Sequence, residues 1–263
     1  MRIAASIEYD GQSFCGWQRQ PDAPNVQSLI ELALSSITQS KITIYAAGRT
    51  DSGVHALGQI IHFDTDVFRP ISAWIKGVNS LLPSSIRVIW AQEVPDEFHS
   101  RYSVIAREYQ YVLINNPINS ALWNSYAGWN YYALDYNLVQ QACIKFIGEH
   151  DFSSFRSSEC QAASPVRDIY FFDVKRFGDD YIFTIQANGF LHHQIRNMIG
   201  AIILVGRELK DPDFINLLLT QKDRSKAPPT FMPNGLYLTN IKYDNKWGLP
   251  SANNKLKFFG RSD

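Results

Sequence analysis

The 263-residue chain has few cysteines, no excess of either charge and no long apolar run. Its three cysteines, Cys15, Cys143 and Cys160, lie far apart and form no C-x-x-C unit. They therefore predict neither a disulfide framework nor a zinc site, and they favour a reducing cytoplasm. No apolar run reaches the roughly 20 residues that a bilayer-spanning helix needs, and the N-terminus turns polar too early for a secretory signal. We expect a cytoplasmic protein with no membrane segment and no metal.

The charge balance restricts the classes of partner. The sequence has 25 Lys and Arg residues against 25 Asp and Glu, so its formal net charge is zero. Nucleic-acid-binding domains are usually basic, and the composition therefore argues weakly against such a partner. An RNA-binding protein of this composition must concentrate its arginines on one face. Hydrophobic residues make up 45% of the chain, which is enough for a large core and argues against disorder.

The hydrophobic pattern predicts two halves with the same order of elements. Period-2 alternation indicates strands, and apolar residues spaced three and four apart indicate helices. In the first half the patterns predict strands at 2–10, 42–46, 57–64 and 86–94, and helices at 26–37 and 71–82. In the second half they predict strands at 107–114, 168–175, 181–187 and 235–243, and helices at 136–148 and 190–206.

Each half therefore follows the order β-α-β-β-α-β, which is ferredoxin-like. We predict an α+β fold in which the two halves form a mostly antiparallel mixed sheet. The expected subdomains are an N-terminal one over 1–105 and a C-terminal one over 106–249, followed by a polar tail over 250–263.

The stretch AAGRTDSGVHALGQ, residues 46–59, is unusual for a connection between two predicted strands, because it places Arg49 and Asp51 between two glycines. Turn chemistry offers one interpretation, in which Asp accepts backbone hydrogen bonds, Gly supplies positive φ and Arg49 pairs with Asp51 as a local brace. An exposed pair of this kind contributes only ~0–1 kcal/mol. In the other interpretation the loop presents a carboxylate to a ligand.

Three further segments combine arginines with aromatic rings. They are FHSRY (98–102), REYQY (107–111) and FSSFRSSECQAASPVRD (152–168), the last with Arg156 and Arg167 around a Ser-rich loop. Arginines and aromatic rings in loops are the composition that grips phosphates and stacks bases. The alternatives are a buried aromatic corner for the first segment and a flexible connection for the last.

Six motifs occur in order along nearly the whole chain. They are YDGQSFCGWQRQ (9–20), AGRTDSGVHALGQ (47–59), FHSRYSVIAREYQY (98–111), HDFSSFR (150–156), NGFLHHQIRNMIG (188–200) and GLYL (235–238). Together they resemble the TruA-type tRNA pseudouridine synthases, a family that isomerises uridines 38, 39 and 40 in the anticodon stem-loop of tRNAs. The block around GRTDSGVHA is the most diagnostic of the six.

The resemblance implies a role for each matched residue. It makes Asp51 the catalytic aspartate, Arg196 the cation that pairs with it and Tyr109 the ring that stacks on the target uracil. Leu236 would help to wall the base pocket. Expected RNA contacts in a central cleft are Arg49, Arg69, Phe98, His99, Ser100, Arg101, Tyr102, Arg156, Cys160, Gln161, Ala162, Ala163 and Ser164. The family also implies a homodimer with tRNA crossing both subunits, and no cofactor.

Two departures from the family pattern concern the pocket wall. His192 and Gln194 stand where aromatic or apolar residues are expected, and the Pro-rich lead-in to GLYL is altered to APPTFMPN. If residues 190–206 form one helix, His192 and Arg196 are four apart and lie on the same side of it.

The expected reaction breaks the C1′–N1 bond of uridine, turns the uracil and rejoins it through C5. A lone ionised carboxylate can serve as nucleophile or stabiliser, and a neighbouring guanidinium favours its charged form. Tyr109 can also move a proton, because its hydroxyl both donates and accepts. The sequence leaves open whether Asp51 attacks C1′, attacks C6 or promotes a glycal intermediate.

Two other functions compete with this one. A non-catalytic tRNA-binding or RNA-folding protein on the same scaffold would bind tRNA without isomerising it. A carboxylate-dependent hydrolase would need a second carboxylate or metal ligands near Asp51, for which Asp64 and Asp66 are the nearest candidates in sequence. Their place at a strand end favours a capping or solubilising role.

Overall fold

The computed structural model describes residues 1–250 and 256. These form two compact units, one of Met1–Ile105 with the described residues from Tyr237 onward, the other of Ala106–Leu236. The strand predicted at 235–243 groups mainly with the first unit, because it pairs there with a strand of that unit. Of the predicted polar tail 250–263, all but Pro250 and Leu256 lie outside the described residues.

The first unit has a sheet in which β1 (Arg2–Tyr9) pairs antiparallel with both β3 (His55–Asp64) and β4 (Ile86–Val94). The two-residue strand β2 (Tyr45–Ala46) pairs antiparallel with β3. β10 (Leu236–Tyr243) joins β3 in parallel, with Tyr237 opposite His55. The predicted element order of the first half is confirmed, and this one parallel pairing makes the sheet mixed.

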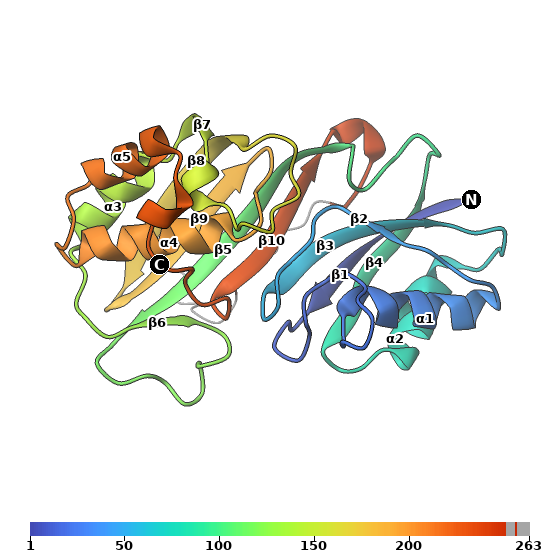
Figure 1. The fold of residues 1–263 in the computed structure, drawn as a ribbon. Coiled ribbons are helices and arrows are strands. Elements are labelled where there is room, and N and C mark those ends of the chain that lie inside the picture. Colours follow the sequence, from blue (N-terminus) through green and yellow to red (C-terminus); the bar gives the residue numbers. More distant parts are fainter. Residues whose placement is uncertain (251–255, 257–263) are drawn as a thin grey trace. The chain divides into compact units, whose positions relative to one another are not determined.

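Two helical segments cover one face of this sheet (Figure 1). α1 (Val26–Thr38) begins where the side chain of Asn25 accepts a hydrogen bond from the Ser28 amide at 2.9 Å. The helix predicted at 71–82 is instead a π-helical turn, Ala73–Gly77, followed by the short α2 (Val78–Leu81). Trp74 in the π-turn is buried and packs edge-on against Phe63.

The second unit has a sheet in the order β5-β9-β8-β7, with every pairing antiparallel. The strands are β5 (Val104–Asn115), β7 (Gly148–Asp151), β8 (Val166–Phe177) and β9 (Asp180–Ala187). A short strand, β6 (Gly128–Asn130), runs parallel to β5. The α+β class with mostly antiparallel strands is therefore confirmed, and the two short strands β6 and β7 are additions to the predicted set.

Three helices belong to the second unit (Figure 1): α3 (Tyr136–Ile144), α4 (Gln194–Gly206) and α5 (Asp213–Gln221). α4 is buried along most of its length. It begins at Gln194 and not at 190, because His193 takes the left-handed conformation with a φ of 64°. The prediction that His192 and Arg196 share one side of a helix is therefore wrong. Among the described residues, no helix combines the length and apolar character needed to cross a bilayer.

Candidate active site

The loop between β2 and β3 is fixed by the side chain of Gln59. Gln59 is fully buried on β3, and its Nε2 donates to the Gly48 carbonyl at 2.7 Å. Its Oε1 accepts from the Gly48 amide at 3.3 Å. One side chain thus binds both backbone groups of the residue before Arg49. Because Gln59 belongs to a core strand, the loop that carries Asp51 is tied to the core.

The segment that follows β1 supports the same loop from another side. The hydroxyls of Tyr9 and Thr50 lie 2.8 Å apart in the interior, and the Trp17 amide donates to the Thr50 carbonyl at 3.1 Å. The Ser52 hydroxyl donates to the Phe14 carbonyl at 3.2 Å. The YDGQSFCGWQRQ motif therefore acts as a buttress for the loop that contains Asp51.

This buttress approaches the loop so closely that two of its positions require glycine. A Cβ on Gly11 would lie 2.0 Å from the Val54 carbonyl oxygen. A Cβ on Gly16 would lie 2.7 Å from the Thr50 carbonyl oxygen, and the φ of Gly16 is +91°. Any side chain at either place would push the buttress away from the loop.

Asp51 is half-buried, and its carbonyl accepts from the Val54 amide at 3.2 Å in a turn where Gly53 has a φ of 77°. Arg49 is exposed, and no ion pair joins it to Asp51 in the part of the chain that the structure describes. The interpretation of the two side chains as a local brace is therefore not supported. Backbone and glutamine hydrogen bonds hold this turn instead.

Tyr109 lies on β5 of the second unit, opposite Ile185 of β9. Only 6% of the residue is exposed, and its ring meets Phe190 edge-on at 5.2 Å with an interplanar angle of 85°. Such edge-to-face contacts are a preferred geometry of aromatic pairs, so Phe190 fixes the orientation of the phenol ring.

Arg196 lies in the first turn of α4, and its Nε donates to the Phe231 carbonyl at 2.8 Å. This bond orients the guanidinium plane. The next residue of that segment, Met232, accepts a hydrogen bond at 2.9 Å from the hydroxyl of Tyr111 on β5. Residues 227–235 therefore connect the helix that carries Arg196 with the strand that carries Tyr109. We call them the connecting segment.

Arg224 fastens the connecting segment to α4. Its Nη1 donates to the carbonyls of Ala227 and Pro228 at 3.1 and 2.9 Å. Its Nη2 donates to Asn197 Oδ1 at 3.1 Å and to Thr230 Oγ1 at 3.2 Å. Asn197 follows the candidate arginine on α4 and is fully buried. The amino-acid sequence gives no sign of this role, because a hydrogen bond between residues 27 positions apart leaves no local pattern.

Leu236 ends the second unit directly after the connecting segment. It is 5% exposed, and the preceding Gly235 carbonyl accepts from the Val112 amide of β5 at 2.9 Å. Asp51 thus belongs to the first unit, whereas Tyr109, Arg196 and Leu236 belong to the second. Their assembly into one site stays a prediction.

The 98–102 segment divides into buried and accessible residues. Phe98 and Ser100 are both fully buried, and the Ser100 hydroxyl lies 2.9 Å from Nδ1 of His62. Arg101 and Tyr102 are exposed and His99 is half-buried, with the Arg101 guanidinium 5.7 Å from the Tyr102 ring centre. Only these three present side-chain surface for stacking or phosphate contact.

A stack of rings lies beneath that accessible surface. His62 stacks on Tyr45 at 5.0 Å, and His99 lies 4.6 Å from His62 and 4.3 Å from Tyr102. Burial, together with the nearby His99 and Arg2, lowers the pKa of His62 to about 4. Burial also lowers the pKa of His99. Both imidazoles are therefore neutral at physiological pH.

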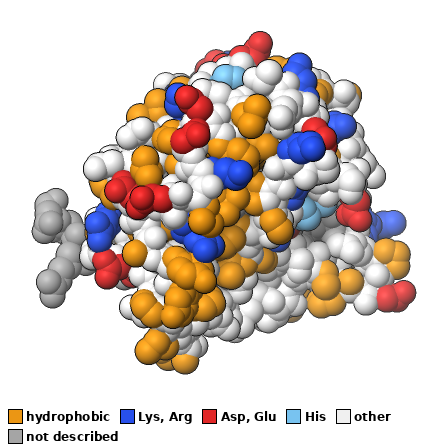
Figure 2. Space-filling view, turned by 60° about the vertical axis from the view of Figure 1, so that its left-hand side comes forward, with side chains coloured by type: hydrophobic (Ala, Val, Ile, Leu, Met, Phe, Trp, Pro, Cys, Tyr) orange, Lys and Arg blue, Asp and Glu red, His pale blue; other side chains and the backbone are white. Residues whose placement is uncertain are grey.

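The remaining predicted RNA contacts lie at the surface. Arg69 is exposed on the chain between β3 and the π-turn, and Arg156 is half-buried after β7. In the following loop Gln161, Ala163 and Ser164 are exposed. Cys160 and Ala162 are partly exposed. Figure 2 shows one face of the molecule, on which hydrophobic side chains gather with Lys and Arg side chains between them.

The unusual Gln194 has a structural explanation. Gln194 is buried, and its side-chain Oε1 accepts from the Leu191 amide at 2.8 Å. Its backbone amide donates to the Leu191 carbonyl at 3.1 Å. This reciprocal pair closes the first turn of α4. His192 precedes the helix, and its carbonyl accepts from the Ser157 amide at 2.9 Å.

The second carboxylate that a hydrolase would need is occupied elsewhere. Both oxygens of Asp64 accept from Arg2, at 2.8 and 2.9 Å, and the hydrogen bond from Arg2 lowers the pKa of Asp64. This bidentate pair joins the ends of β1 and β3. The observation favours the structural interpretation of Asp64 and argues against the hydrolase.

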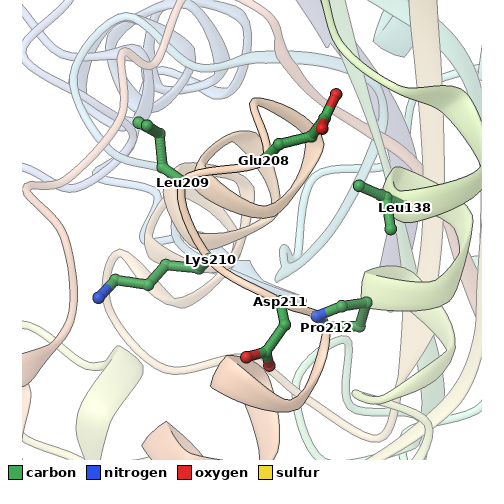
Figure 3. A pocket seen from close by; sticks show the side chains of 6 residues that line it. All are labelled: Leu138, Glu208, Leu209, Lys210, Asp211 and Pro212. Carbon is green, nitrogen blue, oxygen red and sulfur yellow. The ribbon is translucent and has the colours of Figure 1, made fainter.

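A surface hollow of about 510 Å³ lies in the second unit (Figure 3). Leu138 of α3 lines it, together with the turn from Glu208 to Pro212 between α4 and α5. None of the predicted site residues lines it. Its acidic, basic and aliphatic groups show no common chemistry, so we assign it no role.

Comparison with known proteins identifies the family. A family model described as tRNA pseudouridine synthase matches residues 5–103 and 142–244. A protein of Methylobacillus flagellatus named tRNA pseudouridine synthase A is 49% identical over 257 residues, covering 98% of each chain. Proteins of the same name from Nitrosomonas eutropha and Chromobacterium violaceum are each 48% identical, covering 96% and 95% of this chain and 91% and 96% of their own.

A solved structure titled "Crystal Structure of a Cbf5-Nop10-Gar1 Complex" aligns with 90% of this chain and 58% of that chain. Its TM-score of 0.37 and 11% identity are too low to support an argument. The family model and the relatives are sufficient by themselves: the chain belongs to the tRNA pseudouridine synthase family.

Proposed function

We propose that this chain isomerises uridine to pseudouridine at positions 38, 39 and 40 in the anticodon stem-loop of tRNAs, without a cofactor. The observation that carries the proposal is the loop around Asp51, which Gln59 ties to the core and the 9–20 segment supports. A loop held in this way can present one carboxylate in a fixed position, as preorganised catalysis requires. Membership of the family supplies the reaction class.

In the proposed site Asp51 is the catalytic carboxylate and Arg196 stabilises its negative charge. The hydrogen bond that Arg196 Nε donates to the Phe231 carbonyl supports this role, because it sets the direction of the guanidinium. The reaction breaks the C1′–N1 bond and forms the C1′–C5 bond, while C5 loses a proton to solvent and the freed N1 gains one. Tyr109 stacks on the uracil and moves a proton through its hydroxyl, while Leu236 walls the base.

The energetics require contacts beyond the base itself. Extracting a paired nucleotide costs a few kcal/mol, whereas stacking a base on an aromatic ring returns about 1–3 kcal/mol. Phosphate contacts must supply the difference. We assign them to the accessible residues among the predicted set, with Phe98 and Ser100 supporting the accessible His99, Arg101 and Tyr102 from the interior.

The proposal extends to the assembly. By family resemblance the enzyme is a cytoplasmic homodimer whose tRNA crosses both subunits. A near-neutral chain agrees with this arrangement only if the basic groups gather where the RNA lies, since the sequence balances 25 cationic against 25 anionic residues.

The test is a map of pseudouridine in unmodified tRNA after incubation with purified protein. We expect the chemical reactivity specific to pseudouridine at positions 38, 39 and 40 after incubation with the wild-type protein, and none after incubation with Asp51→Ala. Both proteins should bind tRNA with comparable affinity. Wild-type protein that binds tRNA with a normal salt dependence but modifies no uridine would instead identify a non-catalytic RNA-binding protein.

A further inference from the structure

A second polar hollow, of about 340 Å³, lies in the second unit. Its walls come from two segments that contact each other, the turn after β7 and the turn after α5. The lining residues are Ser153, Arg156, Ser157, Ser158, Lys222, Asp223 and Arg224. We call this hollow the serine–arginine pocket.

Buried groups hold the first wall of the pocket in place. Phe152 and Phe155 are both fully buried, and the hydroxyl of the buried Ser154 donates to the Leu218 carbonyl of α5 at 2.6 Å. Asn197 of α4 donates through Nδ2 to the Phe155 carbonyl at 2.7 Å. The wall is therefore organised before any ligand binds, which lowers the entropic cost of binding.

The cations of the pocket differ in what they already bind. Arg224 donates to four acceptors of the protein, and Lys222 Nζ lies 3.3 Å from Asp151 Oδ2. Arg156 makes no hydrogen bond or ion pair with the described residues. Its guanidinium is planar, permanently charged and matched to two phosphate oxygens. It is the group in the pocket most available to an anion.

The two carboxylates near the pocket are satisfied by donors of their own. Asp223 accepts from both the amide and the hydroxyl of Ser225, at 2.9 and 2.8 Å. The hydrogen bonds from Ser225 lower the pKa of Asp223, which therefore stays ionised. Asp151 accepts from the Ser153 amide at 2.9 Å and pairs with Lys222.

We propose that the serine–arginine pocket binds one backbone phosphate of the RNA, a role that rests on the proposed function. Arg156, Lys222 and Arg224 against Asp223 and Asp151 leave a net charge of about one positive unit, counting each ionised group once. A phosphodiester carries one negative charge and matches this balance, whereas free phosphate near neutral pH carries more. The hydroxyls of Ser157 and Ser158 supply neutral donors beside the guanidinium.

The position of the pocket supports an RNA ligand. The Ser157 amide donates to the His192 carbonyl, directly before the helix that carries Arg196. On the other side, Arg224 lines the pocket and also fastens the connecting segment whose Phe231 orients Arg196. A phosphate bound here would therefore contact the segments that also hold Arg196 in place.

Phosphate-ethylation interference tests this proposal directly. tRNA ethylated at random phosphates is partitioned by binding to the wild type, to Arg156→Gln and to Lys222→Gln. We expect one phosphate at which ethylation blocks binding to the wild type but no longer matters for Arg156→Gln, with the other positions unchanged. The same variant should bind tRNA about tenfold more weakly, and its slope of log affinity against log salt should fall by about 1.

The matched control is Lys226→Gln, which removes an exposed cation from the same turn but outside the pocket lining. It should leave the interference pattern as in the wild type. Ser158→Ala, an exposed change that spares the fold, should weaken binding with loss of the same interference. Circular dichroism and thermal unfolding verify that each variant is folded.

Identical interference patterns and salt slopes in wild type, Arg156→Gln and Lys222→Gln would overturn the proposal. Amide shifts of Ser157 and Ser158 on titration with inorganic phosphate, without any change in the RNA pattern of the variants, would identify a small-anion site and also overturn it. A wild type that shows the interference but forms no pseudouridine would remove the proposed function and leave the pocket. A wild type that forms pseudouridine, with pocket variants that bind tRNA unchanged, would remove the pocket and leave the proposed function.

Discussion

Replacing Gln59 by Leu should weaken catalysis more than tRNA binding. The side chain is fully buried and makes two hydrogen bonds with Gly48, one at 2.7 Å and a longer one at 3.3 Å. A net contribution of about 1 kcal/mol for each bond gives a loss of about 2 kcal/mol in the free energy of unfolding. Leucine fills a similar volume, so the cavity contribution is small.

The catalytic effect follows from the loop that Gln59 holds. Freed from Gly48, the chain that carries Asp51 can shift, and a displacement of about 1 Å in a catalytic group can cost on the order of 10²-fold in rate. We expect kcat to fall by roughly 10- to 100-fold, with the Kd for tRNA within about twofold of wild type, because all the predicted RNA contacts except Arg49 lie outside this loop.

Urea unfolding measures the stability change, and single-turnover kinetics with saturating enzyme measure the rate. Gln92→Leu is the control, since Gln92 lies on β4 of the same unit, is half-buried and makes one long bond of 3.3 Å to the Gly248 carbonyl. It should change neither quantity appreciably. A Gln59→Leu protein that loses stability but keeps the wild-type kcat would refute the claim that Gln59 positions the catalytic loop.

Three further predictions concern Arg224, Gly11 and His62. Arg224→Met removes four hydrogen bonds that fasten the connecting segment to α4. We expect a loss of about 2–4 kcal/mol in the free energy of unfolding and a reduced kcat. Arg224→Lys lacks the paired N–H donors of the guanidinium group, so it should restore little of either in the same unfolding and single-turnover measurements. Gly11→Ala places a Cβ 2.0 Å from the Val54 carbonyl oxygen, so its melting temperature should fall by several degrees, and an unchanged value would show that the buttress can move aside. The pKa of His62 lies at about 4, below its ordinary value, so the unfolded state binds the extra proton between about pH 6.5 and 4. Stability should therefore be complete above this window and fall as the pH drops through it. In urea titrations at each pH, His62→Asn, whose Oδ1 can replace Nδ1 as acceptor, should lose most of that slope and keep the part due to His99, whose pKa burial also lowers.

The fold could be predicted to the extent that local patterns determine it. Alternation over eight to twelve residues marks β1, β5 and β8, and the cap at Asn25 marks the start of α1. The strands β6 and β7 have only three and four residues, too few for alternation to stand out. The start of α4 depends on the left-handed backbone of His193, which apolar spacing does not reveal.

The candidate site divides in the same way. The loop around Asp51 is marked by its own residues, because an arginine and an aspartate between glycines are rare in a strand connection. The residues that hold the loop cannot be recognised from the sequence, since Gln59, Tyr9 and Trp17 contact it only through tertiary hydrogen bonds. The burial of Phe98 and Ser100 likewise follows from packing and hydrogen bonds with distant residues, including His62 and Tyr243.

We propose that the carboxylate of Asp51 carries out the chemistry while other groups bind the RNA. Release of tritium from tRNA labelled at C5 of its uridines tests this claim most directly, because forming the C1′–C5 bond expels that hydrogen to water. With saturating protein, the wild type should release tritium equivalent to its modified uridines, and Asp51→Asn should release none while binding tRNA normally. Tritium release by Asp51→Asn at a rate comparable with the wild type would show that the chemistry does not need the Asp51 carboxylate.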